Sequence, residues 1–335
     1  MAQSVNDLGI DLGTSNLVIY MKGRGIVLRE PFTVAVDRDT NSIMAFGMEA
    51  YRMIGRTPSN ISIIRPLAQG EMIDFDLTCT MLRYFIGKIT GKRLFSRPRA
   101  IMSVPSGIKD VEKKALVTAM FDAGLRRTQI LDRTIAAALG AQLNFLGEYG
   151  SLVADMSAGG TDAAVLYNGS ISVMSHIQTG GDHFDDAVIR FLRKKYNLLV
   201  GERTAEQVKI ALGGAAKRNP KVMMDVTGRN LISGLPKTLS IDSDEMYEAL
   251  TDYVNDLIEG IQAIIERTPP QLASDIFEGG VVLTGGSALL YGLSETISTV
   301  LKIPCQIAPD ARDCIALGCG KILQNPAALR YLLEK

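Results

Sequence analysis

The stretch VADMSAGGTD, residues 153–162, consists of an apolar run that ends in an aspartate, a turn of small residues, a threonine and a second acid. Near the N-terminus, GIDLGTSN, residues 9–16, has the same construction. In both stretches the aspartate, Asp11 or Asp155, ends a strand-like run and precedes a small-residue turn. We therefore predict a duplicated lobe with a cleft between the two copies.

The same spacing recurs further along both copies. Gly25 and Gly169 are separated by as many residues as Asp11 and Asp155, and each glycine marks a predicted hairpin. Elsewhere, short β-rich runs alternate with longer segments in which apolar residues recur every three or four positions. This alternation predicts an α/β architecture with mainly parallel central sheets. The predicted strands include 17–21, 25–30, 99–104, 151–155, 171–177 and 281–284, and the predicted helices include 108–123, 133–144, 183–196, 204–212, 243–266 and 287–300.

The composition is that of a folded, neutral protein. Its 335 residues suffice for two lobes, and 47% of them are hydrophobic. Because 36 basic and 36 acidic side chains cancel, the chain lacks the field of a general nucleic-acid binder. Four cysteines without CxxC spacing argue against a zinc site and favour free thiols in a reducing cytoplasm. With neither a secretory signal nor an apolar run of roughly 20 residues, we expect a soluble or membrane-peripheral protein.

The turn in DLGTSN has the groups of a phosphate site. Gly13 permits a tight turn, and Thr14, Ser15 and Asn16 supply backbone and side-chain donors that suit phosphate oxygens. Asp11, at the end of the strand, is placed to hold the water ligands of Mg²⁺. The alternative is an ordinary hairpin with an acid at its edge, since small-residue turns are common.

The turn in DMSAGGTD repeats these groups. Asp155 is the second metal-side acid, and Gly159, Gly160 and Thr161 supply donors. Ser157 stands where the first copy has a glycine. Serine costs little there if its φ is negative, but roughly 1 kcal/mol or more if the turn is left-handed. We expect a looser loop that still binds phosphate.

A third glycine turn follows the predicted strand 281–284. Gly285, Gly286 and Ser287 precede an amphipathic segment, and a helix N-terminus opened by glycines accepts an anion or a polar ring. A single turn of this kind is more often a plain connection between a strand and a helix. Three such turns around one cleft would enclose a nucleotide from both lobes.

These turns and the segments around them resemble the actin and heat-shock chaperone ATPase superfamily, and within it the MreB family of bacterial actin homologues. The resemblance runs nearly end to end, through DLGTSNLVIYMKGRGIVLREP, GRTPSNISIIRPLAQGEMIDFD, VPSG, GERTAEQVKIALG, LTGGSALL and IALGCGKIL. It implies an α/β, actin-like duplicated two-lobe fold with ribonuclease-H-like lobes and a central nucleotide cleft. The four implied subdomains are IA (1–32, 74–144 and 320–335), IB (33–73), IIA (145–182 and 243–319) and IIB (183–242).

The resemblance also implies roles for the residues at matching positions. ATP would lie in the cleft, with Mg²⁺ held through water on the side of Asp11 and Asp155. Glu206 and Lys209, one helical turn apart, would approach the ribose and the adenine; a solvated ion pair between them is the alternative. The phosphates would meet Gly13, Thr14, Ser15 and Asn16 from one lobe and Gly159, Gly160 and Thr161 from the other, while Gly285, Gly286 and Ser287 would close the adenosine side.

The chain departs from the family where hydrolysis is decided. The family usually has EEP before the helix that enters the cleft, and here Asp132, Arg133 and Thr134 stand there. The second glutamate of EEP is expected to orient the attacking water, whereas arginine has no acceptor. Asp162, which replaces the glutamate of the family's DIGGGTTE, is a candidate substitute, and a salt bridge between Arg133 and Asp162 is the alternative. We expect nucleotide binding to be kept and hydrolysis to be slow or absent.

The segment GKRLFSRPR, residues 91–99, is similar to the membrane-inserting loop of the family. Leu94 and Phe95 lie among basic residues, a pattern that suits an anionic membrane surface; packing under the following strand is the alternative. The resemblance implies head-to-tail filaments at the inner face of the cytoplasmic membrane. There they would maintain rod shape by organising cell-wall synthesis with membrane proteins of wall elongation. A non-hydrolysing paralogue in a mixed filament is the main alternative, and a sugar-kinase-type enzyme fits less well.

Overall fold

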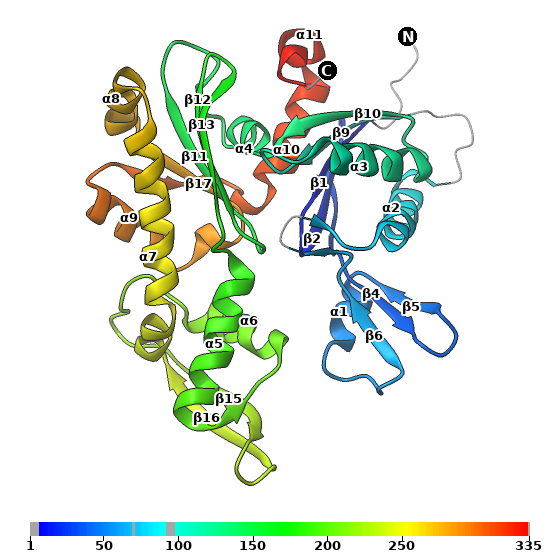
Figure 1. The fold of residues 1–335 in the computed structure, drawn as a ribbon, viewed down its shortest axis with the longest axis vertical. Helices are drawn as coiled ribbons and strands as arrows, with labels where there is room; N and C mark the ends of the chain where they lie inside the picture. The colour runs from blue at the N-terminus through cyan, green and yellow to red at the C-terminus, as the bar shows by residue number, and fades with distance from the viewer. Residues whose placement is uncertain (1–6, 69–70, 92–97, 334–335) are drawn as a thin grey trace.

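Each half of the chain forms a five-stranded sheet with the same strand order (Figure 1). The computed structural model describes residues 7–68, 71–91 and 98–333. The sheet of the N-terminal half, lobe I, has the order β3-β2-β1-β9-β10. Its strands are β1 (Leu8–Leu12), β2 (Asn16–Met21), β3 (Gly25–Pro31), β9 (Arg99–Val104) and β10 (Arg127–Asp132). The sheet of lobe II has the order β13-β12-β11-β17-β18, with strands β11 (Ser151–Met156), β12 (Thr161–Tyr167), β13 (Ser170–Ile177), β17 (Val281–Thr284) and β18 (Cys305–Ile307). The predicted duplication is confirmed.

The two hairpin turns match in their hydrogen bonds. Gly13 N donates to Asn16 O at 2.9 Å, and Ser157 N donates to Gly160 O at 2.9 Å. Neither Gly13 nor Ser157 has a positive φ, so serine fits the second turn without backbone strain. Ser157 Oγ also donates to Gly160 O at 2.9 Å, which tightens this turn rather than loosening it.

The prediction of mainly parallel central sheets is wrong. In lobe I, β1–β2 and β2–β3 pair antiparallel, and β1–β9 and β9–β10 pair parallel; lobe II repeats this mixture. The antiparallel half follows from the tight turns, since a short hairpin reverses the chain. Gly25 and Gly169, with φ of 78° and 72°, form the second hairpin of each lobe in the left-handed conformation that glycine permits.

A smaller subdomain extends from the same end of each lobe (Figure 1). In lobe I it contains β4 (Val34–Asp37), β5 (Ser42–Phe46), α1 (Met48–Met53) and β6 (Ile61–Ile64). In lobe II it contains α5 (Gly181–Tyr196), β14 (Leu198–Leu199), α6 (Glu202–Leu212), β15 (Met223–Asn230) and β16 (Pro236–Asp242). The remaining elements pack on the central sheets or lie near the C-terminus: β7 (Leu67–Ala68), β8 (Glu71–Met72), α2 (Phe75–Thr90), α3 (Asp110–Asp122), α7 (Ser243–Arg267), α8 (Pro270–Gly279), α9 (Leu293–Leu301) and α11 (Pro326–Leu329).

Two helices pack against each other where the lobes meet, α4 (Arg133–Gly140) and α10 (Cys314–Gln324) (Figure 1). The contact is backbone to backbone: a Cβ atom on Gly140 would lie 1.8 Å from Cys314 O, and one on Gly318 would lie 1.9 Å from Ala136 O. The buried cluster around these helices includes Ile101 of lobe I and residues of β11 and β12 of lobe II. This helix pair therefore joins the two lobes. Arg133, the first residue of α4, lies at their junction.

Several predicted boundaries differ from the observed elements. The predicted helix 287–300 is divided into a 3-10 turn, Ser287–Leu289, and α9, because Gly292 adopts a left-handed φ of 72° between them. The predicted subdomain boundaries at 182/183 and 319/320 fall inside α5 and α10. Leu94 and Phe95 lie outside the described residues. Within the described ranges, no helix combines the length and apolar character needed to cross a membrane.

Candidate nucleotide-binding cleft

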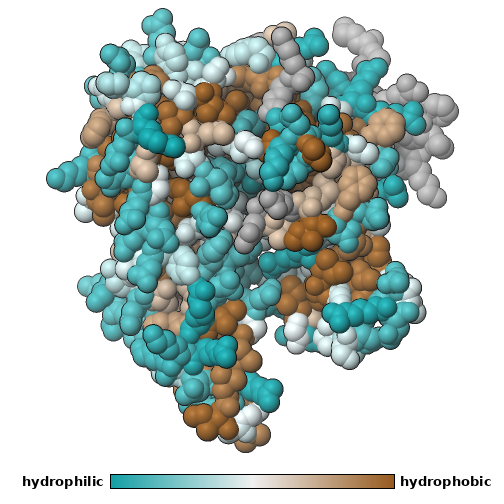
Figure 2. Space-filling model, in the orientation of Figure 1, coloured by the Kyte–Doolittle hydropathy of each residue, from teal (hydrophilic) through white to brown (hydrophobic). Residues whose placement is uncertain are grey.

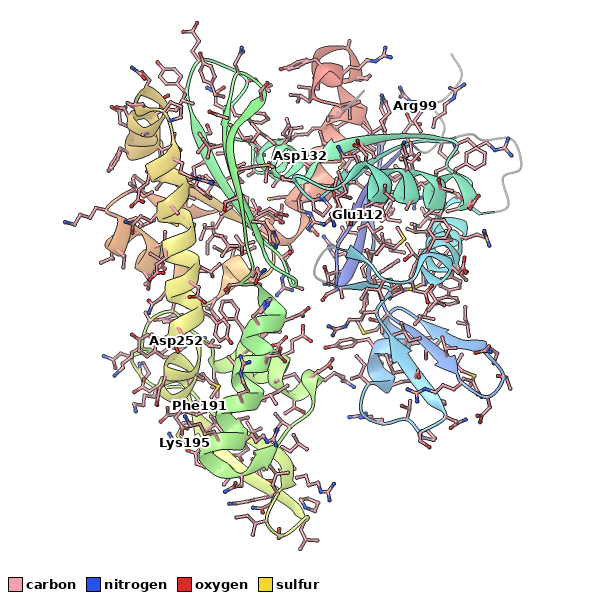
Figure 3. All side chains as sticks on the ribbon, in the orientation of Figure 1. Arg99, Glu112, Asp132, Phe191, Lys195 and Asp252 are labelled. Carbon is pink, nitrogen blue, oxygen red and sulfur yellow. The ribbon has the colours of Figure 1, made fainter. Side chains whose placement is uncertain are left out.

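The predicted phosphate turns of both lobes open on one cavity of about 190 Å³. Lobe I contributes Thr14, residues 105–109, Glu112 and Arg133, and lobe II contributes Ser157, Gly159, Gly160, Asp162 and His176. Asp132 positions the lobe I side: its carboxylate accepts from Thr134 N at 2.8 Å and from Ser106 Oγ at 2.8 Å, which ties the VPSG loop to the start of α4. Figure 3 shows Asp132 and Glu112 on the lobe I side of the space between the lobes.

The two metal-side acids are held alike. Ser103 Oγ donates to Asp11 Oδ1 at 3.3 Å, and Thr284 Oγ1 donates to Asp155 Oδ1 at 2.7 Å. Each hydroxyl comes from the strand that pairs in parallel with the strand of its aspartate. Burial raises the pKa of both carboxyls, and it raises the pKa of Asp155 to about 7, against the lowering effect of Arg133. The two copies therefore match in the hydrogen bond that holds the aspartate as well as in their sequence pattern.

The acids fit a cation that keeps most of its water. Asp155 Oδ2 is buried and has no hydrogen-bond partner among the described residues. The same part of the chain holds no cluster of three or more histidine, cysteine or acidic side chains that would bind a metal directly. Mg²⁺ usually takes only one or two protein carboxylates and several waters, so Asp11 and Asp155 would suffice to hold it.

We expect Asp155→Asn to change how the stability of the metal-free protein depends on pH. A carboxyl with a folded-state pKa of about 7 and an ordinary value of 3.8 costs stability as the pH rises between these values. The loss is on the order of 2–4 kcal/mol and stays constant at higher pH. In EDTA, the wild type should therefore lose more thermal stability from pH 5 to pH 8 than Asp155→Asn. The surface variant Asp252→Asn should follow the wild type, and parallel profiles for all three proteins would contradict this expectation.

Arg133 lies at the centre of the acidic groups. Its side chain is buried, Nη2 is 3.3 Å from Leu12 O, and Nη1 is 3.8 Å from Asp162 Oδ2. Burial alone would lower the pKa of Arg133, but the carboxylates of Asp11, Asp162, Asp155 and Asp132 outweigh it and raise the pKa. The ion pair with Asp162 that was kept as an alternative is thus present, as a loose contact.

Asp162, the candidate substitute for the missing glutamate, has one carboxylate oxygen in a hydrogen bond and the other beside a cation. Its Oδ1 accepts from His176 Nδ1 at 2.7 Å, and its Oδ2 faces Arg133. The hydrogen bond to Asp162 raises the pKa of His176. The His176 ring lies against the second phosphate turn, since a Cβ atom on Gly160 would lie 2.6 Å from His176 Cε1. A water that Asp162 oriented would therefore have to share Oδ1 with His176 or approach Oδ2 next to Arg133.

Residues of the predicted adenosine side lie next to the second phosphate turn. Gly285 has a φ of 86°, and a Cβ atom on it would lie 2.3 Å from Met156 O. Ser287 Oγ donates to Ser157 O at 3.1 Å. The third turn is therefore built directly onto the second.

Glu206 and Lys209 have separate partners instead of the ion pair that was the alternative. Lys209 Nζ donates to Gly181 O and to Asp185, both at 3.0 Å. Burial raises the pKa of Asp185 to about 7, although Lys209 lowers it. Glu206 accepts a hydrogen bond from the hydroxyl of Tyr51, which belongs to lobe I. Their roles at ribose and adenine stay predictions.

A glycine pair at the start of α5, Gly180 and Gly181, was not among the predicted site residues. Gly181 N donates to Ser157 O at 3.0 Å, and Asp182 N donates to Ala158 O at 2.9 Å. A Cβ atom on Gly180 would lie 2.5 Å from Gly160 N. The N–H groups at the start of α5 thus bind the carbonyl oxygens of the second phosphate turn and hold the turn in place. The signal was TGGD, residues 179–182, a double glycine directly before helical periodicity.

Comparison with known proteins shows the family of the chain. A family model described as MreB/Mbl protein matches residues 5–331. The chain belongs to the MreB/Mbl family. It is 41% identical over 319 residues to the cell shape-determining protein Mbl of Bacillus subtilis, which covers 95% of this chain and 96% of that protein. It is 40% identical over 324 residues to the cell shape-determining protein MreB of Escherichia coli K12, with coverage of 95% and 93%.

Solved structures confirm the actin-like fold of this MreB/Mbl-family chain. MreB5 of Spiroplasma citri bound to ADP is 31% identical, with a TM-score of 0.92 and coverage of 96% of this chain and 97% of that one. The AMPPNP-bound form is 30% identical, with a TM-score of 0.93 and coverage of 98% and 99%. A chain of the MamK double helical filament, at 17% identity, a TM-score of 0.80 and coverage of 95% and 99%, shares the fold.

The mouth of the cleft in this MreB/Mbl-family chain is bridged by side chains of the two small subdomains. Besides the hydrogen bond from Tyr51 to Glu206, Arg203 Nη1 donates to Arg52 O at 3.1 Å. Arg65 lies 3.7 Å from Asp182 and 3.6 Å from Glu202. Glu206 therefore has a partner across the mouth that a bound ribose would have to share.

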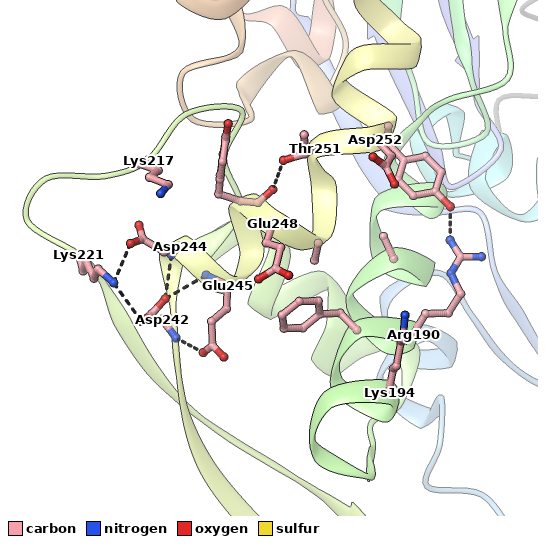
Figure 4. Close-up of a pocket in the computed structure, with 15 residues that line it drawn as sticks. Arg190, Lys194, Lys217, Lys221, Asp242, Asp244, Glu245, Glu248, Thr251 and Asp252 are labelled. Atoms are coloured by element: carbon pink, nitrogen blue, oxygen red, sulfur yellow. Dashed lines mark hydrogen bonds and ion pairs between the residues drawn. The ribbon is translucent and has the colours of Figure 1, made fainter.

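A larger hollow of about 960 Å³ lies between α5 and α7, away from the phosphate turns (Figure 4). Its charges largely satisfy one another: Lys221 Nζ is 3.5 Å from Asp242 and 2.7 Å from Asp244, and Asp242 Oδ1 caps α7 through Asp244 N and Glu245 N. The smaller cavity is the candidate nucleotide site, because residues of both duplicated turns line it together with Arg133 and Asp162.

Proposed function

We propose that this chain is an ATP-binding, actin-like filament subunit that helps to determine cell shape. The observation that carries the proposal is the pair of matching acid-and-turn units that open on one cleft from two lobes. Support comes from relatives named as cell shape-determining proteins and from MreB5, which was solved bound to ADP and to AMPPNP. Mg²⁺ is proposed as the accompanying ion because Asp155 Oδ2 lacks a partner among the described residues.

We further propose that the filaments are membrane-associated and organise cell-wall synthesis. The basis for membrane contact is the sequence around Leu94 and Phe95, which resembles a membrane-inserting loop. Many copies along a filament would convert this modest anchor into firm attachment through effective concentration. The corresponding location is the inner face of the cytoplasmic membrane, where membrane proteins of wall elongation would be the partners.

Hydrolysis is the part of the function that the site disfavours. Arg133 offers donors only, and Asp162 is bonded to His176 and faces Arg133. A scaffold or regulatory subunit of a mixed filament is therefore the second candidate, in which a conventional relative supplies turnover. Phosphate release measured with this chain alone, and then with such a relative, separates the two.

Exposed apolar side chains at opposite ends of lobe II suit end-to-end assembly. The loop between β15 and β16 exposes Leu231, Ile232 and Leu235, with Ile232 81% exposed, and Figure 2 shows this hydrophobic end at the bottom of the molecule. At the opposite end of lobe II (Figure 1), the last residue of β12, Tyr167, and Phe277 of α8 are exposed. Contacts between unlike ends that do not close into a ring produce filaments.

We expect the purified chain to sediment with Mg²⁺-ATP above a threshold concentration, and more strongly with anionic liposomes, while it releases little phosphate.

Ile232→Asp should raise that threshold concentration roughly tenfold or more, since a buried contact would receive an unpaired charge. Val300→Asp, at an exposed position on α9, is the matched control. Equal sedimentation of both variants would exclude this loop from the interface, and no sedimentation of the wild type at any concentration would contradict the filament proposal.

A further inference from the structure

Arg133 is a buried cation whose donors are poorly used by the protein itself. Only 3% of the residue is exposed, and Nε is buried without a hydrogen-bond partner among the described residues. The two other contacts are long, at 3.3 Å to Leu12 O and 3.8 Å to Asp162 Oδ2, whereas hydrogen bonds of this kind are usually about 2.7–3.2 Å. Buried donors are normally satisfied, so these groups indicate a missing acceptor.

The position of Arg133 identifies the kind of acceptor. The side chain lines the cavity between the phosphate turns. Its contacts link the two turns, because Leu12 precedes the first turn and Asp162 follows the second. A planar guanidinium is suited to phosphate oxygens, with which it forms paired, charge-assisted hydrogen bonds.

The charge of the site gives Arg133 a second effect. Asp11, Asp155 and Asp162 are all buried here, and a nucleoside triphosphate would add several negative charges. In a cleft of carboxylates alone, a divalent cation has to supply the whole compensating charge. Arg133 supplies part of this charge permanently. The resemblance implies a glutamate at this position in the family, and replacing a glutamate by an arginine changes the local charge by two.

We infer that Arg133 is a built-in counter-cation of the phosphate site, and that this chain consequently binds nucleoside triphosphates with little dependence on Mg²⁺. The inference rests on the proposed nucleotide binding and adds to it. It assigns the binding of phosphate, rather than a purely structural ion pair with Asp162, as the main role of this arginine.

The test is the affinity for AMPPNP, measured by calorimetry below the assembly concentration, in millimolar Mg²⁺ and in EDTA. The wild type should bind within about tenfold of the same affinity in both buffers, because one cation near a phosphate at protein-like dielectric contributes at least that much. Arg133→Gln should lose roughly 10–100-fold in EDTA and clearly less in Mg²⁺. Arg133→Lys, which keeps the charge but not the paired donors, should fall between them.

The controls separate the inference from its foundation. Arg190→Gln, in the larger hollow between α5 and α7, should bind AMPPNP as the wild type does in both buffers. A wild type that loses clearly more than about tenfold in EDTA, or an Arg133→Gln that loses equally in both buffers, overturns the counter-cation role while leaving nucleotide binding intact. Absence of AMPPNP binding even with Mg²⁺ overturns the proposed function itself. If Arg133→Gln does not fold, the wild type and Arg133→Lys still decide the outcome.

Discussion

Gly318→Ala should cost the folded protein about 3 kcal/mol or more, because the added methyl group has no space. A Cβ atom there would lie 1.9 Å from Ala136 O and 2.7 Å from Ala136 C. These are backbone atoms of α4, which cannot rotate away as a flexible side chain would. The two helices would have to separate, and the buried cluster that joins the lobes would open with them.

Denaturation by urea, followed by circular dichroism, measures this effect. Gly87→Ala is a matched control, since Gly87 also lies inside a helix but has open space where its Cβ atom would be. That control should gain about 0.5–1 kcal/mol, the usual advantage of alanine over glycine in a helix. If Gly318→Ala loses less than about 1 kcal/mol, the lobes are joined more loosely than the contact between α4 and α10 indicates.

The same contact connects the fold to the site. Arg133 is the first residue of α4, and Asp132 caps this helix through Thr134 N and Ile135 N. A displacement of α4 against α10 would therefore move the guanidinium relative to both phosphate turns. We expect Gly318→Ala, where it remains folded, to weaken AMPPNP binding as well as stability.

The duplicated part of the site was predictable because it is local in sequence. An apolar strand, an aspartate and a small-residue turn lie within ten residues, so both copies could be recognised and aligned, and the structure supports both acids in the same way. The cost of Ser157 at the position that matches Gly13 could also be stated in advance, because serine fits a turn with a negative φ and is strained in a left-handed one. Neither position has a positive φ, so the serine fits.

The missed parts depend on contacts between distant segments. His176 is an ordinary strand residue until β12 and β13 pair and bring it to Asp162. The contact from Tyr51 to Glu206 joins residues of different lobes, and Gly180 contacts Gly160 only after α5 packs on the turn. Periodicity and spacing carry no information about such pairs, whereas a double glycine before a helix was a local signal that we passed over.

Arg133→Glu should make the stability of the protein depend on a divalent cation. The substitution removes the cation that offsets the four carboxylates around it and adds a fifth; the four are Asp11, Asp132, Asp155 and Asp162. Leaving buried charges without their partner costs about 3–5 kcal/mol. In EDTA, we expect the melting temperature to fall by roughly 4–7 °C relative to the wild type. Millimolar Mg²⁺ should restore much of this loss, because an ion that binds only the folded state stabilises it.

Arg133→Gln is the control for this expectation, since it removes the cation without adding an acid. Its melting temperature should fall less in EDTA and respond less to Mg²⁺. Equal melting temperatures of Arg133→Glu with and without Mg²⁺ would show that the acids do not share a cation site.

The same variant tests the expectation that this chain hydrolyses ATP slowly. A glutamate at position 133 has acceptor oxygens that orient water, which arginine lacks, so phosphate release from Mg²⁺-ATP should rise at least tenfold. The two measurements on Arg133→Glu are independent. If stability becomes Mg²⁺-dependent but turnover does not rise, then Arg133 sets the charge of the cleft without limiting the chemistry. The restriction would then lie with Asp162, whose oxygens are held by His176 and face residue 133, and His176→Ala in the Arg133→Glu background would be expected to release it.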